Sequence, residues 1–303
     1  MKYAFRSECR FLRCLITFLL ICFSAAAIPV SAFEPPEEIL LGVEPEHNIF
    51  DQMERYRLLA DYLSDQLGVK IKLTIMSRYG EVIKRFKTLR LDGAFLTSYT
   101  ATMAIKQLHL EPVVNPVNLA GESTSQGYIF VRKDSGIKGM IDMRGGNIVF
   151  VDPATMEGYL FPLAFLNQHG VKNIKLFFNQ YFFSGSHASA IFAVLDGRAD
   201  IGSAKSTVYS QMVKNDPSIG RELEIIAQSP KVPELTLCIN TAISQDLRER
   251  ISSTLLNMDK TDDGKKVLQQ FKALRFTKAN KGDFAVIEKM AQDVLGSLTV
   301  HGK

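Results

Sequence analysis

Apolar and polar positions follow two different periods along this chain of 303 residues. Short apolar runs are followed by segments whose apolar residues recur every three to four positions, which is the helical spacing. The first two such pairs are Ile39–Val43 with 51–67, and Val69–Ile75 with Glu81–Leu91. Strands and helices that alternate in this way predict an α/β fold, with mostly parallel sheets flanked by helices.

The same alternation continues along the rest of the chain. Further strands are predicted over 94–96, 112–119, 128–131, 148–151, 174–183, 200–203, 223–227 and 235–240. Further helices are predicted over about 98–108, 156–169 and 187–196, and the sequence after residue 240 is predicted to be largely helical.

Two segments without an apolar period interrupt the alternation, Gly121–Gln126 and Ser229–Pro233. Both are typical of connections that cross between lobes. Because the chain crosses twice, we expect a discontinuous first lobe, residues 33–124 and 232–303. Residues 125–231 form the expected second lobe, and each lobe is long enough for a core of its own.

Residues 1–32 have the pattern of a secretory signal peptide. The run Leu15–Val30 is mostly apolar, and small residues allow cleavage after Ala32. Cys22 faintly resembles a lipoprotein cysteine, but the bulky Ile21 before it argues against a lipid anchor. The sequence therefore predicts export to the periplasm through a cleaved signal. The basic residues before the apolar run are Lys2, Arg6, Arg10 and Arg13.

Removal of this segment leaves 32 basic and 31 acidic residues, because four of the 36 Lys and Arg and one of the 32 Asp and Glu lie within it. A surface so balanced in charge excludes a nucleic-acid or membrane-surface function based on charge. Of the four cysteines only Cys238 remains, within an apolar run, so no internal disulfide is expected and the core must hold the fold together. We expect a monomer.

Five polar segments follow predicted strands and precede predicted helices. Helix starts of this kind present hydroxyl groups and free backbone N–H groups together. One such segment is ordinary capping, but parallel strands gather their carboxyl ends at one edge of a sheet. A ligand site is therefore predicted at these ends and between the lobes. The segments are Glu44–Glu46, Thr97–Tyr99, Asp152–Gly158, Ser184–His187 and Ser203–Ser206.

These segments carry a family resemblance over nearly the whole mature chain. The chain resembles the phosphate/phosphite/phosphonate-binding periplasmic proteins of ABC transporters. The most specific matches are Asp152–Tyr159, where the family has Asp-Pro-x-Ser-Thr-Ser-Gly, and Phe183–His187, which contains the family's Ser-Gly-Ser-His. Glu44–Glu46, Ser77–Val82 and Asp92–Tyr99 also match.

The resemblance implies a type II periplasmic-binding-protein clamshell with two interlobe crossovers, which traps a small-molecule solute between its lobes. An ABC permease is the implied partner. In the family, the Ser-Thr-Ser run holds phosphonate oxygens through hydroxyl and backbone N–H groups. The residues that match Tyr79, Tyr128 and His187 line the same site.

The chain departs from the family in this run. Thr155 keeps a hydroxyl, but Met156 and Glu157 replace the next two hydroxyl residues. At about 4 Å, and with an effective dielectric constant of about 20, two like charges repel by about 4 kcal/mol. Binding of simple phosphonates in the family's mode is therefore not expected.

Two orientations of Glu157 are compatible with the sequence. In one, the carboxylate lies in the first turn of a helix, compensates the helix dipole and points to solvent. In the other, it points into the cleft and recognises a cationic or donor-rich solute, with Met156 as an apolar wall. Lys205, at a strand end of the second lobe, either pairs with Glu157 or meets an acidic solute.

The functional hypothesis is a periplasmic solute-binding protein. The alternative is a solute-sensing input for a membrane sensor kinase or cyclase, without transport. No catalytic residue, cofactor or metal site is predicted, because the histidines are scattered and neither a nucleophile elbow nor a phosphate-binding glycine loop is present. The predicted ligand-binding residues are Glu46, Tyr79, Ser98, Tyr99, Tyr128, Thr155, Met156, Glu157, Ser186, His187, Ser203 and Lys205.

Overall fold

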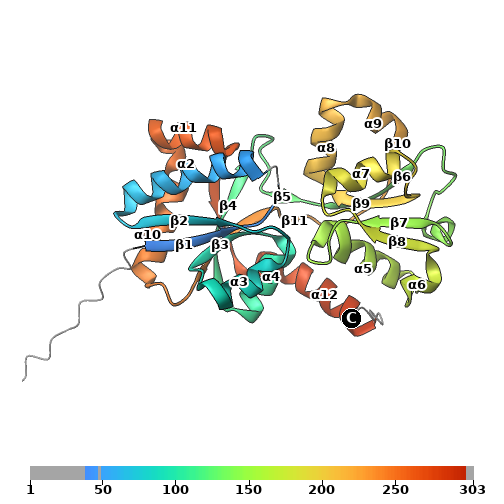
Figure 1. Ribbon diagram of the computed structural model, residues 1–303, viewed down its shortest axis with the longest axis horizontal. Coiled ribbons are helices and arrows are strands. Elements are labelled where there is room, and N and C mark those ends of the chain that lie inside the picture. The colour runs from blue at the N-terminus through green and yellow to red at the C-terminus, as the bar shows by residue number, and fades with distance from the viewer. Residues whose placement is uncertain (1–37, 47–48, 298–303) are drawn as a thin grey trace, which may run out of the picture. The chain divides into compact units, whose positions relative to one another are not determined.

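The computed structural model describes residues 38–46 and 49–297 (Figure 1). The predicted signal peptide, its cleavage point after Ala32 and the cysteine Cys22 lie outside these residues. Within the described ranges, no helix has the length and apolar character needed to cross a membrane.

The first sheet has six strands in the order β13-β4-β12-β3-β1-β2. Strand β1 is parallel to β2 and β3, whereas β12 is antiparallel to β3 and β4, and β13 is antiparallel to β4. The strands are β1 (Glu38–Val43), β2 (Lys70–Ile75), β3 (Gly93–Thr97), β4 (Leu110–Asn118), β12 (Leu235–Asn240) and β13 (Ala273–Lys278).

Helices that pack on this sheet bury an aromatic core. Tyr56 of α2 meets Phe95 of β3 edge-on at 5.0 Å between ring centroids, and Phe271 of α11 meets Tyr56 at 5.1 Å. Helices α2 and α11 also pack against each other. The helical elements between the strands of this sheet are α2 (Ile49–Leu67), α3 (Glu81–Leu89), α4 (Ser98–Gln107), α10 (Gln245–Leu256), η3 (Met258–Lys260) and α11 (Asp262–Phe271).

The second sheet has five strands in the order β10-β6-β9-β7-β8. Strand β7 is parallel to β8 and β9, and β6 is antiparallel to β9 and β10. The strands are β6 (Gly127–Arg132), β7 (Asn147–Phe150), β8 (Gln180–Phe183), β9 (Ile201–Lys205) and β10 (Leu223–Gln228). Its helical elements are η1 (Met140–Met143), η2 (Met156–Leu160), α5 (Phe161–Gln168), α6 (Ile174–Phe177), α7 (His187–Leu195), α8 (Ser206–Asn215) and α9 (Pro217–Glu222).

The chain passes between the sheets at two places that pair with each other. Strand β5 (Thr124–Ser125) and strand β11 (Val232–Pro233) form a short antiparallel ladder (Figure 1). These strands fall in the two segments predicted as crossovers, and the exact lobe boundaries stay a prediction. After β13, η4 (Lys281–Phe284) leads into α12 (Ala285–Ser297), which packs against α4, α5 and η2.

The structure corrects three details of the predicted elements. Both sheets are mixed rather than mostly parallel, because the strands that follow the crossovers, β6 and β12, run against their neighbours. The predicted strand 174–183 is a helical turn, α6, capped by the Asn173 side chain, and then a strand, β8. The C-terminal part is less helical than expected, since β13 lies within it.

Cys238 lies on β12, between β3 and β4, with its side chain fully buried and the thiol free. The predicted place of this cysteine in the core is confirmed. Burial raises the pKa of this thiol well above its usual value.

Candidate functional site

An ion pair connects the strand ends of the two sheets. Glu46 follows β1 of the first sheet, and Lys205 is the last residue of β9 in the second. The Lys205 ammonium Nζ donates to Oε1 of Glu46. Lys205 is 1% exposed, so this is a buried pair and not a solvent-exposed surface contact.

Lys205 has more than one acidic neighbour. Burial alone would lower the pKa of Lys205, but the carboxylates of Glu46, Glu157 and Glu234 outweigh burial and raise it well above its usual value. Lys205 is therefore a cation stabilised by three carboxylates: Glu46, with which it pairs, Glu157 of η2, and Glu234, which follows β11.

Glu157 is 1% exposed and lies in η2, a π-helical turn that continues into α5. Its Oε1 accepts a hydrogen bond from the Ser125 hydroxyl of β5 at 2.6 Å. The orientation in which Glu157 points to solvent is therefore wrong. Within the described part of the chain, no group donates a hydrogen bond to its second oxygen, Oε2.

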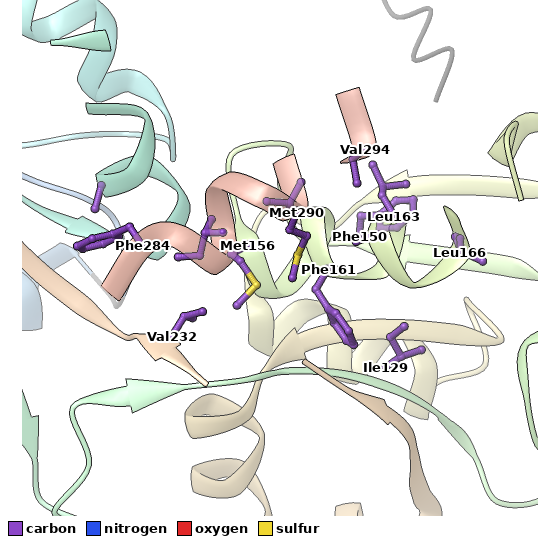
Figure 2. Close-up of a cluster of buried hydrophobic side chains, with 14 of the residues drawn as sticks. Ile129, Phe150, Met156, Phe161, Leu163, Leu166, Val232, Phe284, Met290 and Val294 are labelled. Carbon is purple, nitrogen blue, oxygen red and sulfur yellow. The ribbon is translucent and has the colours of Figure 1, made fainter. Parts of the chain in front are cut away.

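The rest of the altered loop offers few donors to a solute. The Thr155 hydroxyl donates to the backbone carbonyl of Asp152 at 2.7 Å, so it closes its own turn. The Met156 side chain is fully buried and belongs to an apolar cluster with Val232 and Phe284 (Figure 2). Met156 thus lies in the core and does not form the apolar cleft wall that accompanied the second orientation of Glu157.

Gly158 allows η2 to approach the end of β7 closely. A Cβ atom at this position would lie 2.4 Å from Cβ of Val151 and 2.9 Å from Oγ1 of Thr155. These atoms belong to a β-branched side chain and a turn hydroxyl, which have little freedom to move. Gly158 therefore allows η2 to lie close to Val151, and this packing sets the position of the neighbouring Glu157.

We expect Gly158→Ala to lower the free energy of unfolding by about 1–3 kcal/mol, because it overpacks a buried contact. Urea denaturation followed by circular dichroism measures the change. Gly282→Ala is the matched control, since a Cβ there meets no atom within 4 Å. If both variants changed stability equally, the packing role of Gly158 would be refuted.

His187 is held as a neutral imidazole. Its Nδ1 accepts a hydrogen bond from the backbone N–H of Lys205 at 3.0 Å, which places the ring proton on Nε2. Burial, and then the positive charge of Lys205, lower the pKa of His187 well below its usual value. The Tyr79 ring of the first sheet's α3 turn meets the His187 ring edge-on, with centroids 6.3 Å apart.

Two predicted serines serve the local structure. Ser186 caps α7, since its hydroxyl accepts the backbone N–H of Ser189 at 3.1 Å. Ser203 donates its hydroxyl to the backbone carbonyl of Glu157 at 2.5 Å and so fixes η2 against β9. Both hydroxyls are used within the protein.

Glu44, which was not among the predicted ligand residues, organises the first-sheet side of the site. Its Oε2 accepts the backbone N–H of Thr97 at 2.8 Å, the Thr97 hydroxyl at 3.0 Å and the Thr100 hydroxyl at 2.5 Å. Its Oε1 accepts the backbone N–H of Gly80 at 3.2 Å. Burial raises the pKa of Glu44 to about 7, although these hydrogen bonds oppose the rise. The Glu44 carboxylate thus accepts hydrogen bonds from backbone N–H groups at the starts of both α3 and α4.

Ser98, the first residue of α4, is fully buried. Its hydroxyl has no hydrogen-bond partner among residues 38–46 and 49–297. Tyr99 and Tyr128 are partly buried, and the Tyr128 ring packs edge-on against Tyr209, with 5.8 Å between the ring centroids.

Gly80 has a φ of 71° and lies where the α3 turn meets Ala154 of the altered loop. A Cβ atom on Gly80 would lie 2.8 Å from the Cβ atom of Ala154.

A hollow of about 330 Å³ near α6 is lined by residues such as Ile141, Arg144 and Leu176, and none of the predicted ligand residues borders it. Over the described ranges, no group of three or more His, Cys, Asp or Glu side chains is arranged to hold a metal ion.

Comparison with known proteins gives concordant results. The sequence model of a family described as "ABC transporter, phosphonate, periplasmic substrate-binding protein" matches residues 41–284. The probable ABC transporter phosphite binding protein PhnD1 of Prochlorococcus marinus (strain MIT 9301) is 26% identical over 283 residues, 90% of this chain and 94% of the relative.

Two solved structures extend this similarity to the fold. The structure of PhnD1 from Prochlorococcus marinus in complex with methylphosphonate has a TM-score of 0.72 and 25% identity, and covers 87% of this chain and 100% of that chain. A binding protein component of an ABC phosphonate transporter from Pseudomonas aeruginosa has a TM-score of 0.71 and 20% identity, and covers 89% of this chain and 91% of that one.

Proposed function

Because the chain belongs to the family of periplasmic substrate-binding proteins of phosphonate ABC transporters, we propose that it captures a small solute at the strand ends of its two sheets and delivers it to an ABC permease. The predicted family and the type II periplasmic-binding-protein fold are confirmed. The family binds solutes and is not a family of enzymes, and its members act in the periplasm.

We further propose that the solute is not a simple phosphonate. The observation that supports this is the buried Glu157 carboxylate in the loop that matches the family's Ser-Thr-Ser run. A carboxylate accepts hydrogen bonds and repels an anion, whereas hydroxyl groups donate to it. The Thr155 hydroxyl is used by its own turn and Met156 lies in the core, so neither replaces the lost donors.

Phosphate, phosphite, methylphosphonate and aminoethylphosphonate are expected to leave the melting temperature almost unchanged in a thermal-shift measurement. A tight ligand at 100 times its dissociation constant would add about 2.7 kcal/mol to the stability. A clear shift with any simple phosphonate would refute the exclusion. In the same assay, Glu157→Ser is expected to gain phosphonate binding, because it restores a hydroxyl and removes the negative charge.

Native mass spectrometry of freshly purified protein tests solute capture itself. A retained small molecule, released on unfolding, is the expected result. If the protein retains nothing and no solute in a broad library shifts its melting temperature, solute capture is the wrong function.

The alternative is that the protein reports its solute to a membrane sensor kinase or cyclase without transport. The altered loop favours this alternative, because a protein that binds a different solute from its transport relatives can also serve a different process. Neighbouring genes discriminate the two functions: permease and ATPase genes support transport, whereas a lone histidine kinase or diguanylate cyclase gene supports sensing.

A further inference from the structure

Several charged side chains act on one another at this site. Burial raises the pKa of Tyr79, and its further electrostatic neighbours are Glu46, Lys205, Glu44 and Glu157. Lys205 in turn has Glu46, Glu157 and Glu234 as its acidic neighbours. Lys205 thus forms its ion pair with Glu46, and Glu157 and Glu234 act on the same ammonium group electrostatically.

The three carboxylates differ in how completely they are satisfied. Glu46 pairs with Lys205. Glu234 accepts the Thr207 hydroxyl at 2.5 Å on Oε1 and the Asn118 side-chain amide at 3.2 Å on Oε2, and burial raises its pKa. Glu157 has one neutral donor, Ser125, on Oε1, and Oε2 accepts no hydrogen bond from the part of the chain that the structure describes.

Oε2 of Glu157 has no donor but is not fully covered, since Ser98 Oγ is the one fully covered side-chain polar atom without a partner in the described ranges. A carboxylate oxygen in this position is stabilised by a donor that a ligand supplies. Glu157 is 1% exposed, and Lys205 hydrogen-bonds Glu46 instead of Glu157. A second cation is therefore the group that completes this carboxylate best.

A second polar side chain of the described chain is also left without a partner. The buried hydroxyl of Ser98 has no hydrogen-bond partner in the described ranges. Ser98 precedes Tyr99, and the Tyr99 phenol lies close enough to Tyr159 of η2 to act, after burial and Tyr181, on the Tyr159 pKa. Helix α4 and η2 contribute to one apolar cluster, through Ala101 and Ala104 on one side and Met156 and Leu160 on the other, so both unsatisfied groups belong to elements that border the same core. Such groups point to a ligand when no protein atom satisfies them.

We propose that the solute carries an ammonium group and that this group donates a hydrogen bond to Oε2 of Glu157. The proposal rests on the proposed function as a solute-binding protein and names the class of its solute. The neutral donors of His187 Nε2 and Ser98 serve acceptor atoms elsewhere on the solute. Lys205, already paired with Glu46, keeps the site from accumulating a larger negative charge.

Matched solute pairs isolate the ammonium group. The two members of each pair differ in whether they carry amino groups. The pairs are ethanolamine with ethylene glycol, putrescine with 1,4-butanediol, and β-alanine with propionate. Thermal shift and isothermal titration calorimetry with each compound at millimolar concentration are compared. In at least one pair, the amine is expected to stabilise the wild-type protein more than its amine-free partner does.

Glu157→Gln keeps an acceptor for Ser125 and nearly the same shape, but removes the negative charge. Its affinity for the amine is expected to fall roughly 10- to 100-fold, the range for a hydrogen bond to a charged group. Glu54→Gln, an exposed carboxylate on α2, is the control with the same change of charge and is expected to bind as the wild type does.

The results separate this inference from the proposed function. Equal shifts within all three pairs, or an amine affinity that Glu157→Gln leaves unchanged, would overturn the ammonium site. So would a retained solute, identified by native mass spectrometry, that has no cationic nitrogen, although solute capture would then stand. A retained amine whose affinity depends on Glu157 supports both.

Discussion

Lys205→Met is expected to lower the free energy of unfolding by about 3–5 kcal/mol, the usual cost of removing one partner from a buried ion pair. Three carboxylates, Glu46, Glu157 and Glu234, face the Lys205 ammonium, which is 1% exposed. Without it, these groups are left with mutual repulsion and no counter-ion. Urea denaturation of both proteins at neutral pH measures the loss.

Two further variants show that charge, and not packing, causes the loss. Glu46→Gln alone is expected to cost less, because Lys205 keeps Glu157 and Glu234 as neighbours. The double variant Glu46→Gln with Lys205→Met is expected to be more stable than Lys205→Met, since one uncompensated charge is gone. A loss below about 1 kcal/mol for Lys205→Met would show that the pair behaves as a surface salt bridge.

The second large effect concerns the pH dependence that Glu44 imposes. Its pKa is about 7 in the folded protein, against an ordinary value of 4.5. The folded state therefore binds the proton more tightly than the unfolded state, and stability falls as the pH rises through this window. Below about pH 4.5 the contribution is complete, and above about pH 7 it is lost.

The measurement compares wild type with Glu44→Gln at about pH 5 and about pH 8. The stability of wild type relative to the variant is expected to fall by about 2–3 kcal/mol between these values. The difference cancels titrations that both proteins share. Glutamine cannot accept from Gly80 and Thr97 at once without turning its amide donors toward an N–H group, so the variant is also less stable at the lower pH. A pH-independent difference would show that Glu44 keeps an ordinary pKa.

Most elements of the fold could be predicted, because the apolar period is strong wherever a strand or helix covers a core. The failures occur where short-range signals decide. In 174–183, the apolar run is continuous, and only the Asn173 side chain, which accepts the backbone N–H of Lys175, starts a helical turn within it. In β13, a bulge between Ala273 and Arg275 breaks the alternation that marks a strand.

The candidate site was predicted as a set of strand ends, but not as a set of side-chain orientations. Two adjacent side chains of the altered loop have different surroundings. Met156 lies in the apolar core, whereas Glu157 accepts a hydrogen bond from Ser125. The π-helical turn decides this, and it depends on Gly158 packing against Val151, a contact between residues seven positions apart. Helical periodicity carries no information on such a contact.

Glu44 and Glu46 illustrate the same limit. Both carboxylates come directly after β1, and the sequence identified the segment as a functional strand end. Which of the two satisfies the helix starts depends on the positions of Gly80 and Thr97, which follow only from the sheet order. The first carboxylate proves structural and the second pairs with Lys205.

The rate at which a thiol reagent modifies Cys238 measures how often the first sheet opens. Only a thiolate reacts with a thiol reagent at an appreciable rate, and burial keeps this thiol protonated and covered. Because β12 lies between β3 and β4, a reagent reaches the sulfur only when the interior of the sheet separates. The labelling rate of Cys238, read by mass spectrometry of the peptide that contains it, therefore reports the frequency of that opening.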